Sequence, residues 1–369
     1  GRDIQREPFT VVGIGDMAGD VFGNGMLLSE QIKLVAAFNH MHIFIDPNPD
    51  PAVSFAERKR LFEQPRSAWS DYDSSLISSG GGVFDRSAKT IELSAEARAA
   101  LDIDATRLSP LELINRILKA PVDLLWNGGI GTYVKARTES HAKVGDRAND
   151  GLRVNGRDLR CAAVGEGGNL GLTQAGRIEY ALAGGRLNTD AIDNSGGVDS
   201  SDLEVNIKIA LGTVEAANAL TREDRNTLLA SMTPEVIELV LATNYLQTQQ
   251  ISLMEAEGIT RFDEQVSFMR ALEREGRLDR RLERLPDDET IEERARNRQG
   301  LTRPELAVLI SYSKIALADS VLASDLPDDP WFAQLLEAGF PHAMVEQFPD
   351  AVLQHRLKRE LITTLLTNQ

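Results

Sequence analysis

The uneven distribution of glycine along the chain limits its possible folds more than any other sequence feature. Of the 29 glycines, only four lie beyond residue 212, namely Gly258, Gly276, Gly300 and Gly339. Glycine suits tight loops and close backbone approaches, whereas each glycine inside a helix costs about 1 kcal/mol. We therefore expect an α/β domain over residues 1–205 and a mostly α-helical C-terminal region over residues 206–369.

Apolar patterns in the first part alternate between the spacing of strands and that of helices. Short runs rich in β-branched and aromatic residues predict strands at residues 9–14, 42–45, 122–126 and 159–164. Longer patterns predict helices at residues 16–39, 109–119, 173–183 and 201–218. Alternating strands and helices indicate a parallel sheet with crossover helices on both faces. The expected fold class is α/β, with a doubly wound, Rossmann-like parallel sheet.

The second part carries signals for the starts of helices. Thr233-Pro234-Glu235 predicts one start, and Thr302-Arg303-Pro304-Glu305 predicts another through a capping box. Residues 273–298 are dense in charges of both signs, which favours a solvated helix pair or linker over a basic binding face.

Charge and composition exclude several classes of function. The chain has 40 Lys and Arg against 56 Asp and Glu, and the resulting net charge of −16 repels nucleic acid and anionic membranes. No apolar run is long enough to span a bilayer, and the start of the chain lacks the core of a signal peptide. Cys161 is the single cysteine, so neither an internal disulfide nor a cysteine-cluster zinc site is possible. We expect a cytoplasmic protein with no metal, no nucleic-acid partner and no membrane contact.

A glycine-rich loop follows the first predicted strand. Its pattern is G-x-G-x-x-A, and its candidate cofactor-binding residues are Gly13, Gly15, Asp16, Met17 and Ala18. In such a loop the first glycine makes the turn and the second lets the backbone approach a pyrophosphate. The third small residue lets the helix pack on the strand. The N-terminus of the following helix would attract the phosphates. The loop predicts a dinucleotide site, although glycines between strand and helix also serve packing alone.

Asp46 follows the predicted strand at residues 42–45, which is the second strand in this interpretation. A carboxylate there can accept hydrogen bonds from a ribose diol and would repel a 2′-phosphate, which favours NAD over NADP. The separation from Gly13 exceeds the usual one of about 20 residues, which we ascribe to a long intervening helix. A turn aspartate before Pro47 is the equally weighted alternative.

Three later loops combine asparagine with paired glycines, at residues 126–132, 164–169 and 193–198. The first two follow predicted strands, and the third follows a short strand-like run at residues 188–192 and precedes a helix. The carboxyl ends of parallel strands meet at one crevice where ligands bind. Amide side chains can fix a nicotinamide or ribose without charge. We therefore add Asn127, Gly128, Asn169 and Asn194 to the candidate cofactor-binding residues.

These motifs together resemble a known family. Residues 9–50 and 123–212 resemble the nucleotide-binding half of glutamate dehydrogenase, and more narrowly that of the large, NAD-specific glutamate dehydrogenases of bacteria. The segments that carry this resemblance are residues 12–26, 45–50, 125–132 and 165–171. The helical tail, including residues 302–307, resembles the C-terminal region of the same subfamily.

The resemblance implies NAD as cofactor and roles for individual residues. Glu166-Gly167-Gly168-Asn169 is similar to the family's Glu-Gly-Ala-Asn loop beside the nicotinamide, with glycine in place of alanine. Residues 194–198 are similar to its Asn-Ala-Gly-Gly-Val segment. The family's serine that touches the substrate side-chain carboxylate matches Ser201, although Ser200 is adjacent and the surrounding run is less apolar than in the family.

The implied reaction is the NAD-dependent oxidative deamination of L-glutamate to 2-oxoglutarate and ammonia. This chemistry needs a base and cations that hold the carboxylates. The family supplies lysines and an aspartate from a domain before the nucleotide-binding one, and no lysine here has such a setting; Lys135 lies nearest to a glycine loop. We assign no catalytic residue to this chain. We expect an inactive part of a larger, homo-oligomeric enzyme whose upstream catalytic and regulatory domains are its partners.

Three alternative interpretations stay open at this stage. The chain could be a nucleotide-binding regulatory module without chemistry of its own, or its helical tail could serve chiefly as an assembly surface. Methyltransferases also combine a glycine loop with an acidic residue after the second strand. They lack the three loops in which asparagine accompanies glycine, which makes this the weakest interpretation.

Overall fold

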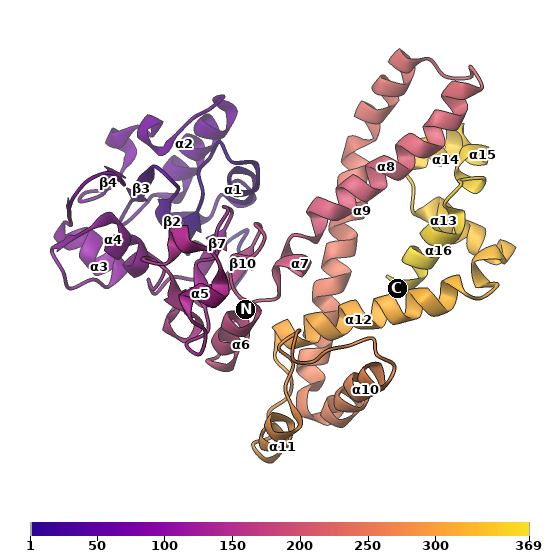
Figure 1. Cartoon of the computed structure of the whole chain (residues 1–369). Coiled ribbons are helices and arrows are strands. Elements are labelled where there is room, and N and C mark those ends of the chain that lie inside the picture. Colours follow the sequence, from indigo (N-terminus) through magenta and orange to yellow (C-terminus); the bar gives the residue numbers. More distant parts are fainter. Residues whose placement is uncertain (1, 369) are drawn as a thin grey trace. The chain divides into compact units, whose positions relative to one another are not determined.

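The computed structural model describes residues 2–368 and contains two compact units (Figure 1). The first unit runs to Asn194 and includes Thr302–Pro304, and the second comprises Ser195–Leu301 and the residues from Glu305 onward. The division therefore falls about ten residues before the boundary expected between residues 205 and 206. Its physical reason is that a single helix begins at Ser195 and packs within the second unit.

The first unit is built on a six-stranded, mostly parallel sheet, which confirms the predicted fold class. In sheet order the strands are β10 (Ala163–Glu166), β7 (Leu124–Asn127), β1 (Phe9–Ile14), β2 (Ile32–Phe38), β3 (His42–Ile45) and β4 (Gly82–Asp85). The first four run parallel, whereas β3 is antiparallel to both β2 and β4. The parallel strands therefore end together at one edge, which we call the carboxyl edge.

The helix expected over residues 16–39 is wrong. Helix α1 covers only Asp20–Gly25, and β2 occupies Ile32–Phe38. β2 is central in the sheet and apolar on both faces, so its run of apolar residues lacks the alternation that marks a half-buried strand. As a consequence, β3 is the third strand along the chain and not the second.

Side chains alternate between two apolar cores on opposite faces of the sheet. Val12 and Ile14 contribute to the core that includes the apolar face of α4 (Pro110–Ile117). Val11 contributes to the other core, together with Phe22 of α1 and Trp69. Both faces are therefore covered, as expected for parallel strands.

The remaining elements of the first unit are mostly short. The helices are α2 (Pro51–Glu63), α3 (Ala95–Leu101), α5 (His141–Val144), α6 (Gln174–Leu182) and α7 (Asp190–Asp193). Two small sheets pair β5 (Ile91–Glu92) with β6 (Arg107–Leu108), and β8 (Val134–Lys135) with β9 (Val154–Asn155). The capping box of α4 is confirmed, since Ser109 and Glu112 bond each other's backbone. The strand-like interpretation of residues 188–192 is wrong, because α7 begins at Asp190. The strand expected at residues 159–164 forms sheet pairs only from Ala163 onward.

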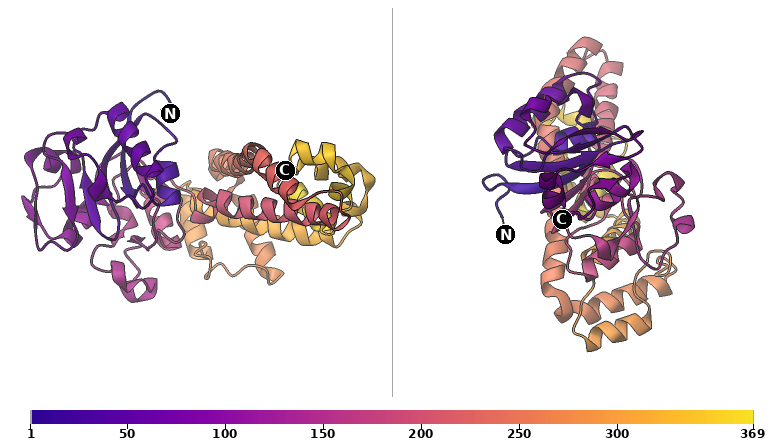
Figure 2. Two further views of the ribbon diagram at one scale, coloured as in Figure 1. Left: turned by 90° about the horizontal axis from the view of Figure 1, so that it is seen from above. Right: turned by 90° about the vertical axis from the view of Figure 1, so that its left-hand side faces the viewer.

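Among the described residues the second unit contains helices and no strand (Figure 2). Its helices are α8 (Ser195–Ala216), α9 (Arg222–Glu257), α10 (Phe262–Arg274), α11 (Asp288–Arg296), α12 (Arg303–Leu322), α13 (Ala333–Ala338), α14 (His342–Gln347), α15 (Pro349–Leu353) and α16 (Lys358–Thr367). Its core joins Ile207 of α8, Met232 of α9 and Leu336 of α13. No helix in the described chain is both long and apolar enough to cross a bilayer.

The helix start expected at residues 233–235 is wrong, because Pro234 lies inside α9. The helix begins at Arg222, where the Thr221 side chain accepts a hydrogen bond from the Asp224 N–H. Proline removes one hydrogen bond from a helix interior, and a helix as long as α9 continues past it. The charged segment at residues 273–298 contains the end of α10, an irregular stretch and α11.

Candidate functional site

Backbone hydrogen bonds hold three of the predicted loops side by side at the carboxyl edge. The Gly15 N–H donates to the Phe38 oxygen (2.8 Å), and the Gly128 N–H donates to the Ile14 oxygen (2.9 Å). The Gly168 N–H donates to the oxygen of Asn127 (3.0 Å). The ends of β2, β1, β7 and β10 are therefore joined in that order, and the loop after each strand contributes to the same edge.

The glycine loop after β1 is shaped by packing against Phe22. A Cβ atom would lie 2.4 Å from the Phe22 ring at Gly13 and 2.8 Å from it at Gly15, and Gly15 has a φ of +140°. These two glycines thus let α1 approach the strand. Close helix packing depends on Gly23, where a Cβ would meet Phe62 at 2.4 Å, and not on Ala18, which is exposed.

The same loop presents free backbone donors at its tip. The N–H groups of Asp16, Met17 and Ala18 have no hydrogen-bond partner within residues 2–368. Successive unpaired N–H groups form a concave anion site without help from a long helix. The sequence predicted that the dipole of the following helix would attract the phosphates, but α1 has only six residues. The run of free N–H groups takes the place of that helix dipole. The Met17 side chain is 1% exposed in the apolar core, so only its backbone can face a ligand.

Asp16 connects the loop to the end of β2. Its carboxylate accepts hydrogen bonds from the Gly19 N–H (3.0 Å) and from the Asn39 side chain (2.8 Å). Asn39 directly follows β2, and its side-chain oxygen accepts from the N–H groups of Met41 and His42. The residue that follows β2 is therefore Asn39, and both its side-chain nitrogen and its side-chain oxygen form hydrogen bonds within the chain.

The structure places Asp46 away from the carboxyl edge. Because β3 runs antiparallel to β2, the Asp46 N–H pairs with the oxygen of Val35, in the middle of β2. The Asp46 side chain is 1% exposed and accepts a hydrogen bond from the Ser78 hydroxyl. Burial raises the pKa of this carboxyl, against the opposing hydrogen bond from Ser78. The assignment of Asp46 to a ribose rested on the strand order, and the observed order does not support it.

The loops after β7 and β10 meet through their glycines. A Cβ at Gly168 would lie 2.8 Å from the backbone oxygen of Gly129, which explains glycine where the family has alanine. At Gly128, a Cβ would lie 2.7 Å from the Phe22 Cα. Asn127 is 1% exposed, and its side-chain nitrogen has no partner among the described residues. Asn127 thus lies beneath the loops, enclosed in this conformation.

Asn169 and Asn194 lie together, but the loop expected at residues 193–198 is wrong, because Asn194 is a single turn residue between α7 and α8, which begins at Ser195. The Asn194 side-chain nitrogen donates to the Asn169 side-chain oxygen at 2.9 Å. Asn169 is exposed and Asn194 half-buried, so both amides can reach a ligand.

A buried network that sequence reasoning missed holds these two asparagines in place. The Glu166 carboxylate accepts hydrogen bonds from Arg177 at 2.7 and 2.9 Å, and Arg177 also pairs with Asp190 (3.0 Å). Asp190 accepts from the Leu170 N–H, and Asp193 accepts from the Glu166 N–H. Burial raises the pKa values of Glu166 and Asp193. A carboxylate at the end of an apolar strand was the available signal, since a buried charge requires a partner.

The second unit holds the candidate substrate residue. Ser201 is exposed on α8, and its hydroxyl donates to the Gly197 oxygen at 3.3 Å. The neighbouring Ser200 donates to the same oxygen at 3.1 Å. Ser195, in contrast, is buried and accepts from Asn244 at 2.8 Å.

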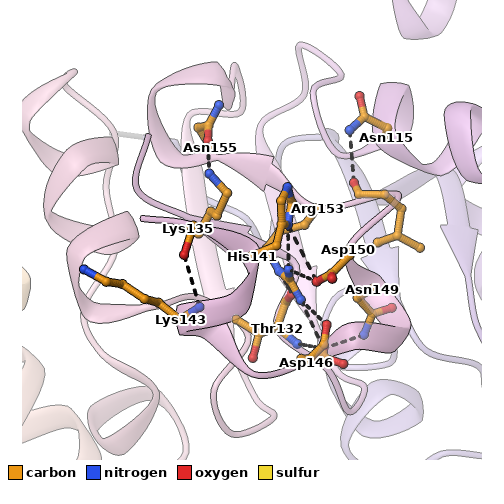
Figure 3. Close-up of polar contacts among 12 residues, drawn as sticks. Asn115, Thr132, Lys135, His141, Lys143, Asp146, Asn149, Asp150, Arg153 and Asn155 are labelled. Atoms are coloured by element: carbon orange, nitrogen blue, oxygen red, sulfur yellow. Dashed lines mark hydrogen bonds and ion pairs between the residues drawn. The ribbon is translucent and has the colours of Figure 1, made fainter. Parts of the chain in front are cut away.

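The ammonium group of Lys135 is buried and already forms hydrogen bonds within the first unit. Its ammonium group donates to the Asn155 side chain (2.8 Å) and to the Ala136 oxygen (3.2 Å), and it is 7% exposed (Figure 3). These contacts tie β8 to β9. No group of three or more His, Cys, Asp or Glu side chains in the described part of the chain is placed to hold a metal ion.

The buried guanidinium of Arg153 fixes the segment that follows the loop after β7. It donates to the Thr132 oxygen (2.7 Å), to Asp150 (2.6 Å) and to a ring nitrogen of His141 (2.8 Å; Figure 3). The Thr132 N–H donates in turn to Asp146 (2.8 Å). Residues 132–153 are therefore held together by these hydrogen bonds, and they fix the C-terminal end of the loop formed by residues 128–131.

Together, the mostly parallel sheet and the loops at its carboxyl edge define an α/β domain. The family model for the bacterial NAD-glutamate dehydrogenase catalytic domain matches residues 1–254, and the model for the glutamate dehydrogenase C-terminal region matches residues 298–369. The chain belongs to the bacterial NAD-glutamate dehydrogenase family, which confirms the resemblance.

Curated relatives agree with this assignment. Proteins named NAD-specific glutamate dehydrogenase from Pseudomonas aeruginosa and Halomonas elongata are 59% and 55% identical over 368 residues. One from Mycobacterium tuberculosis is 53% identical over 374 residues. Each match covers 100% of this chain but 23% of the relative, so the chain spans about a quarter of the length of these enzymes.

Proposed function

We propose that this chain supplies the NAD-binding part and the C-terminal helical region of an enzyme that oxidatively deaminates L-glutamate. The products would be 2-oxoglutarate, ammonia and NADH. The observation that carries the proposal is the convergence of unpaired backbone N–H groups and the Asn169–Asn194 pair at one carboxyl edge. Ligands bind at this edge in open α/β sheets.

The residues at this edge fit NAD. The N–H groups of Asp16, Met17 and Ala18 would hold the pyrophosphate, and the Asn169 and Asn194 amides would orient the nicotinamide and its ribose. When bound, NAD supplies a ring that accepts a hydride. Of the two acidic candidates, Asp16 in the loop after β1 is the one that contacts the end of β2, through Asn39, and its negative charge would disfavour a 2′-phosphate.

The substrate and the catalytic groups are the finer part of the proposal. Ser201 would contact the side-chain carboxylate of L-glutamate, as the family resemblance implies. The lysines that bind and deprotonate the substrate would come from outside residues 1–369, because Lys135, the nearest candidate, is buried against Asn155. We therefore expect this chain alone to bind cofactor without turning over glutamate.

The helical unit supplies a surface for the proposed partners. Ile237, Leu241 and Tyr245 form a stripe along α9 and are 52%, 62% and 63% exposed. Three large apolar side chains at helical spacing mark a surface that another domain or a second copy covers. This supports upstream domains and a homo-oligomer as partners. Cys161, a buried free thiol, is compatible with the reducing cytoplasm.

Two measurements test the proposal. Titration of the chain with NADH, followed by cofactor fluorescence, should show saturable binding that weakens in Asn169→Ala and persists in Asn226→Ala, an exposed asparagine on α9. A glutamate oxidation assay should show no turnover until the longer relative's remaining domains are present. Binding without dependence on Asn169 would move the site elsewhere. Turnover by residues 1–369 alone would show that the catalytic base lies within this chain.

A further inference from the structure

Two large apolar side chains project from the carboxyl edge of the first unit. Ile130, in the loop after β7, is 97% exposed, and Leu170, in the loop after β10, is 66% exposed. Neither side chain belongs to the two apolar cores that the described residues form on the faces of this sheet. Covering such side chains with an apolar group is favourable, and packing within the unit does not account for them.

Hydrogen bonds hold the two loops that carry Ile130 and Leu170 side by side. The Thr132 hydroxyl donates to the Leu170 oxygen at 2.7 Å, and the Tyr133 N–H donates to the Gly171 oxygen at 2.8 Å. Nearer to the strands, the close approach of their glycines joins the same two loops. Ile130 and Leu170 therefore lie on neighbouring loops that are fixed relative to each other, and we call them the apolar pair.

The backbone at Leu170 is held in a conformation that leucine disfavours. Its φ is +57°, in the left-handed region that glycine and asparagine adopt far more readily. The Leu170 N–H donates to Asp190 at 2.7 Å, so hydrogen bonds at both its N–H and its oxygen stabilise this conformation. The same backbone bonds would form with glycine at this position. An exposed leucine therefore costs stability here, which points to a functional contact of its side chain.

The strand order determines which part of a dinucleotide the apolar pair would meet. β7 is next to β1 and β10 is next to β7, whereas β2 lies on the other side of β1 (Figure 1). With the pyrophosphate at residues 16–18, the adenosine half would extend toward the Asp16–Asn39 contact at β2, and the nicotinamide half toward β7 and β10. Neighbouring strands are about 5 Å apart, so both loops begin within about 10 Å of β1. Asn169, which directly precedes Leu170, is one of the two asparagines ascribed to the nicotinamide.

We propose that Ile130 and Leu170 pack against the nicotinamide ring of the bound cofactor and exclude water from it. This inference rests on the proposed NAD site and adds the residues that hold the ring. The apolar pair would cover part of the ring, while the Asn169 and Asn194 amides bond its polar groups and the ribose. This contact explains why both side chains are exposed without a ligand. Excluding water from the ring would also protect a hydride transfer from side reactions.

The test compares NADH with ADP-ribose, which contains the pyrophosphate and the adenosine half but no nicotinamide. Isothermal titration calorimetry of the full chain measures both affinities. Leu170→Gly and Ile130→Ser should each weaken NADH binding about fivefold or more, because apolar contact area is lost, and should leave the affinity for ADP-ribose unchanged. The matched control is Leu28→Ser, which removes a 74% exposed leucine at the opposite edge of the sheet, ahead of β2. It should change neither affinity.

Two further readouts separate a cofactor contact from a structural role. The fluorescence emission of NADH bound to the wild type should be shifted to the blue, as for a ring in apolar surroundings, and this shift should shrink in both variants. Leu170→Gly should unfold at about the same urea concentration as the wild type. Relief of the left-handed strain offsets the greater freedom of glycine in the unfolded chain, so weaker binding could not be attributed to unfolding.

The possible outcomes distinguish this inference from the proposed function. Wild-type NADH affinity and emission in both variants would overturn the inference and leave the cofactor site standing. An equal loss of affinity for ADP-ribose would also overturn it, because the defect would then not concern the nicotinamide. A wild-type chain that binds neither compound would overturn the proposed function, and this inference with it.

Discussion

Removal of Arg177 should strongly destabilise the first unit. Arg177 and Glu166 are 4% and 0% exposed and are joined by two hydrogen bonds of 2.7 and 2.9 Å. Breaking a buried ion pair on one side costs about 3–5 kcal/mol, since the remaining charge stays desolvated. In Arg177→Met, Asp190 and Asp193 would additionally repel Glu166, which places the expected loss of unfolding free energy in the upper half of that range.

The loss should depend on pH with a definite sign. Without Arg177, burial and the two aspartates raise the folded-state pKa of Glu166 further above its unfolded value of about 4.3. The folded variant then holds a proton at pH values where the unfolded chain has already lost it. Its stability relative to the wild type should therefore recover as the pH falls from 7 to 5, by at most about 1.4 kcal/mol per pH unit.

Urea denaturation followed by tryptophan fluorescence is the appropriate assay, because Trp69 and Trp126 both lie in the first unit. Arg160→Met is the matched control, since Arg160 pairs with Asp102 at the surface and should cost about 1 kcal/mol or less. The reasoning fails if Arg177→Met lies within about 1 kcal/mol of the wild type at pH 7. It also fails if the difference between the two proteins does not shrink at pH 5.

Three further predictions concern single positions. Asp46→Ser should leave the preference for NADH over NADPH unchanged, whereas Asp16→Asn should reduce this preference. Affinity measurements with both cofactors would test this. The opposite pattern would show that Asp46 holds the ribose. Gly168→Ala should destabilise by about 1–3 kcal/mol because its Cβ meets backbone, while Gly212→Ala, in open helix surroundings, should stabilise by up to about 1 kcal/mol; equal urea midpoints for the two variants would contradict this. Cys161 should react slowly with a thiol reagent at pH 8 and quickly in urea, because burial raises its pKa to about 11, and a fast native reaction would refute its enclosure.

The loop convergence could be predicted because it depends on local residue types and one general rule. Glycine and asparagine after short apolar runs indicate loops at strand ends, and parallel strands bring those loops together. The rule accounts for the loops that carry Gly15, Gly128 and Asn169, but not for Asn194, which lies between α7 and α8.

The error at Asp46 has a different physical origin. A strand buried on both faces is apolar throughout, so β2 at Ile32–Phe38 was absorbed into a helix prediction. Every later strand was then counted one place too early, and the antiparallel direction of β3 could not be anticipated. The Glu166–Arg177 network was missed because its members are distant in sequence and become partners only through the fold.

The contact between NADH and the carboxyl edge is the central claim, and backbone amide NMR of the deuterated chain tests it most directly. On titration with NADH, the amide signals of Asp16, Met17 and Ala18 should shift together with the side-chain amide signals of Asn169 and Asn194. All of these signals should follow one binding curve. Shifts confined to the helical unit, or saturation without any change at residues 16–18, would contradict the account.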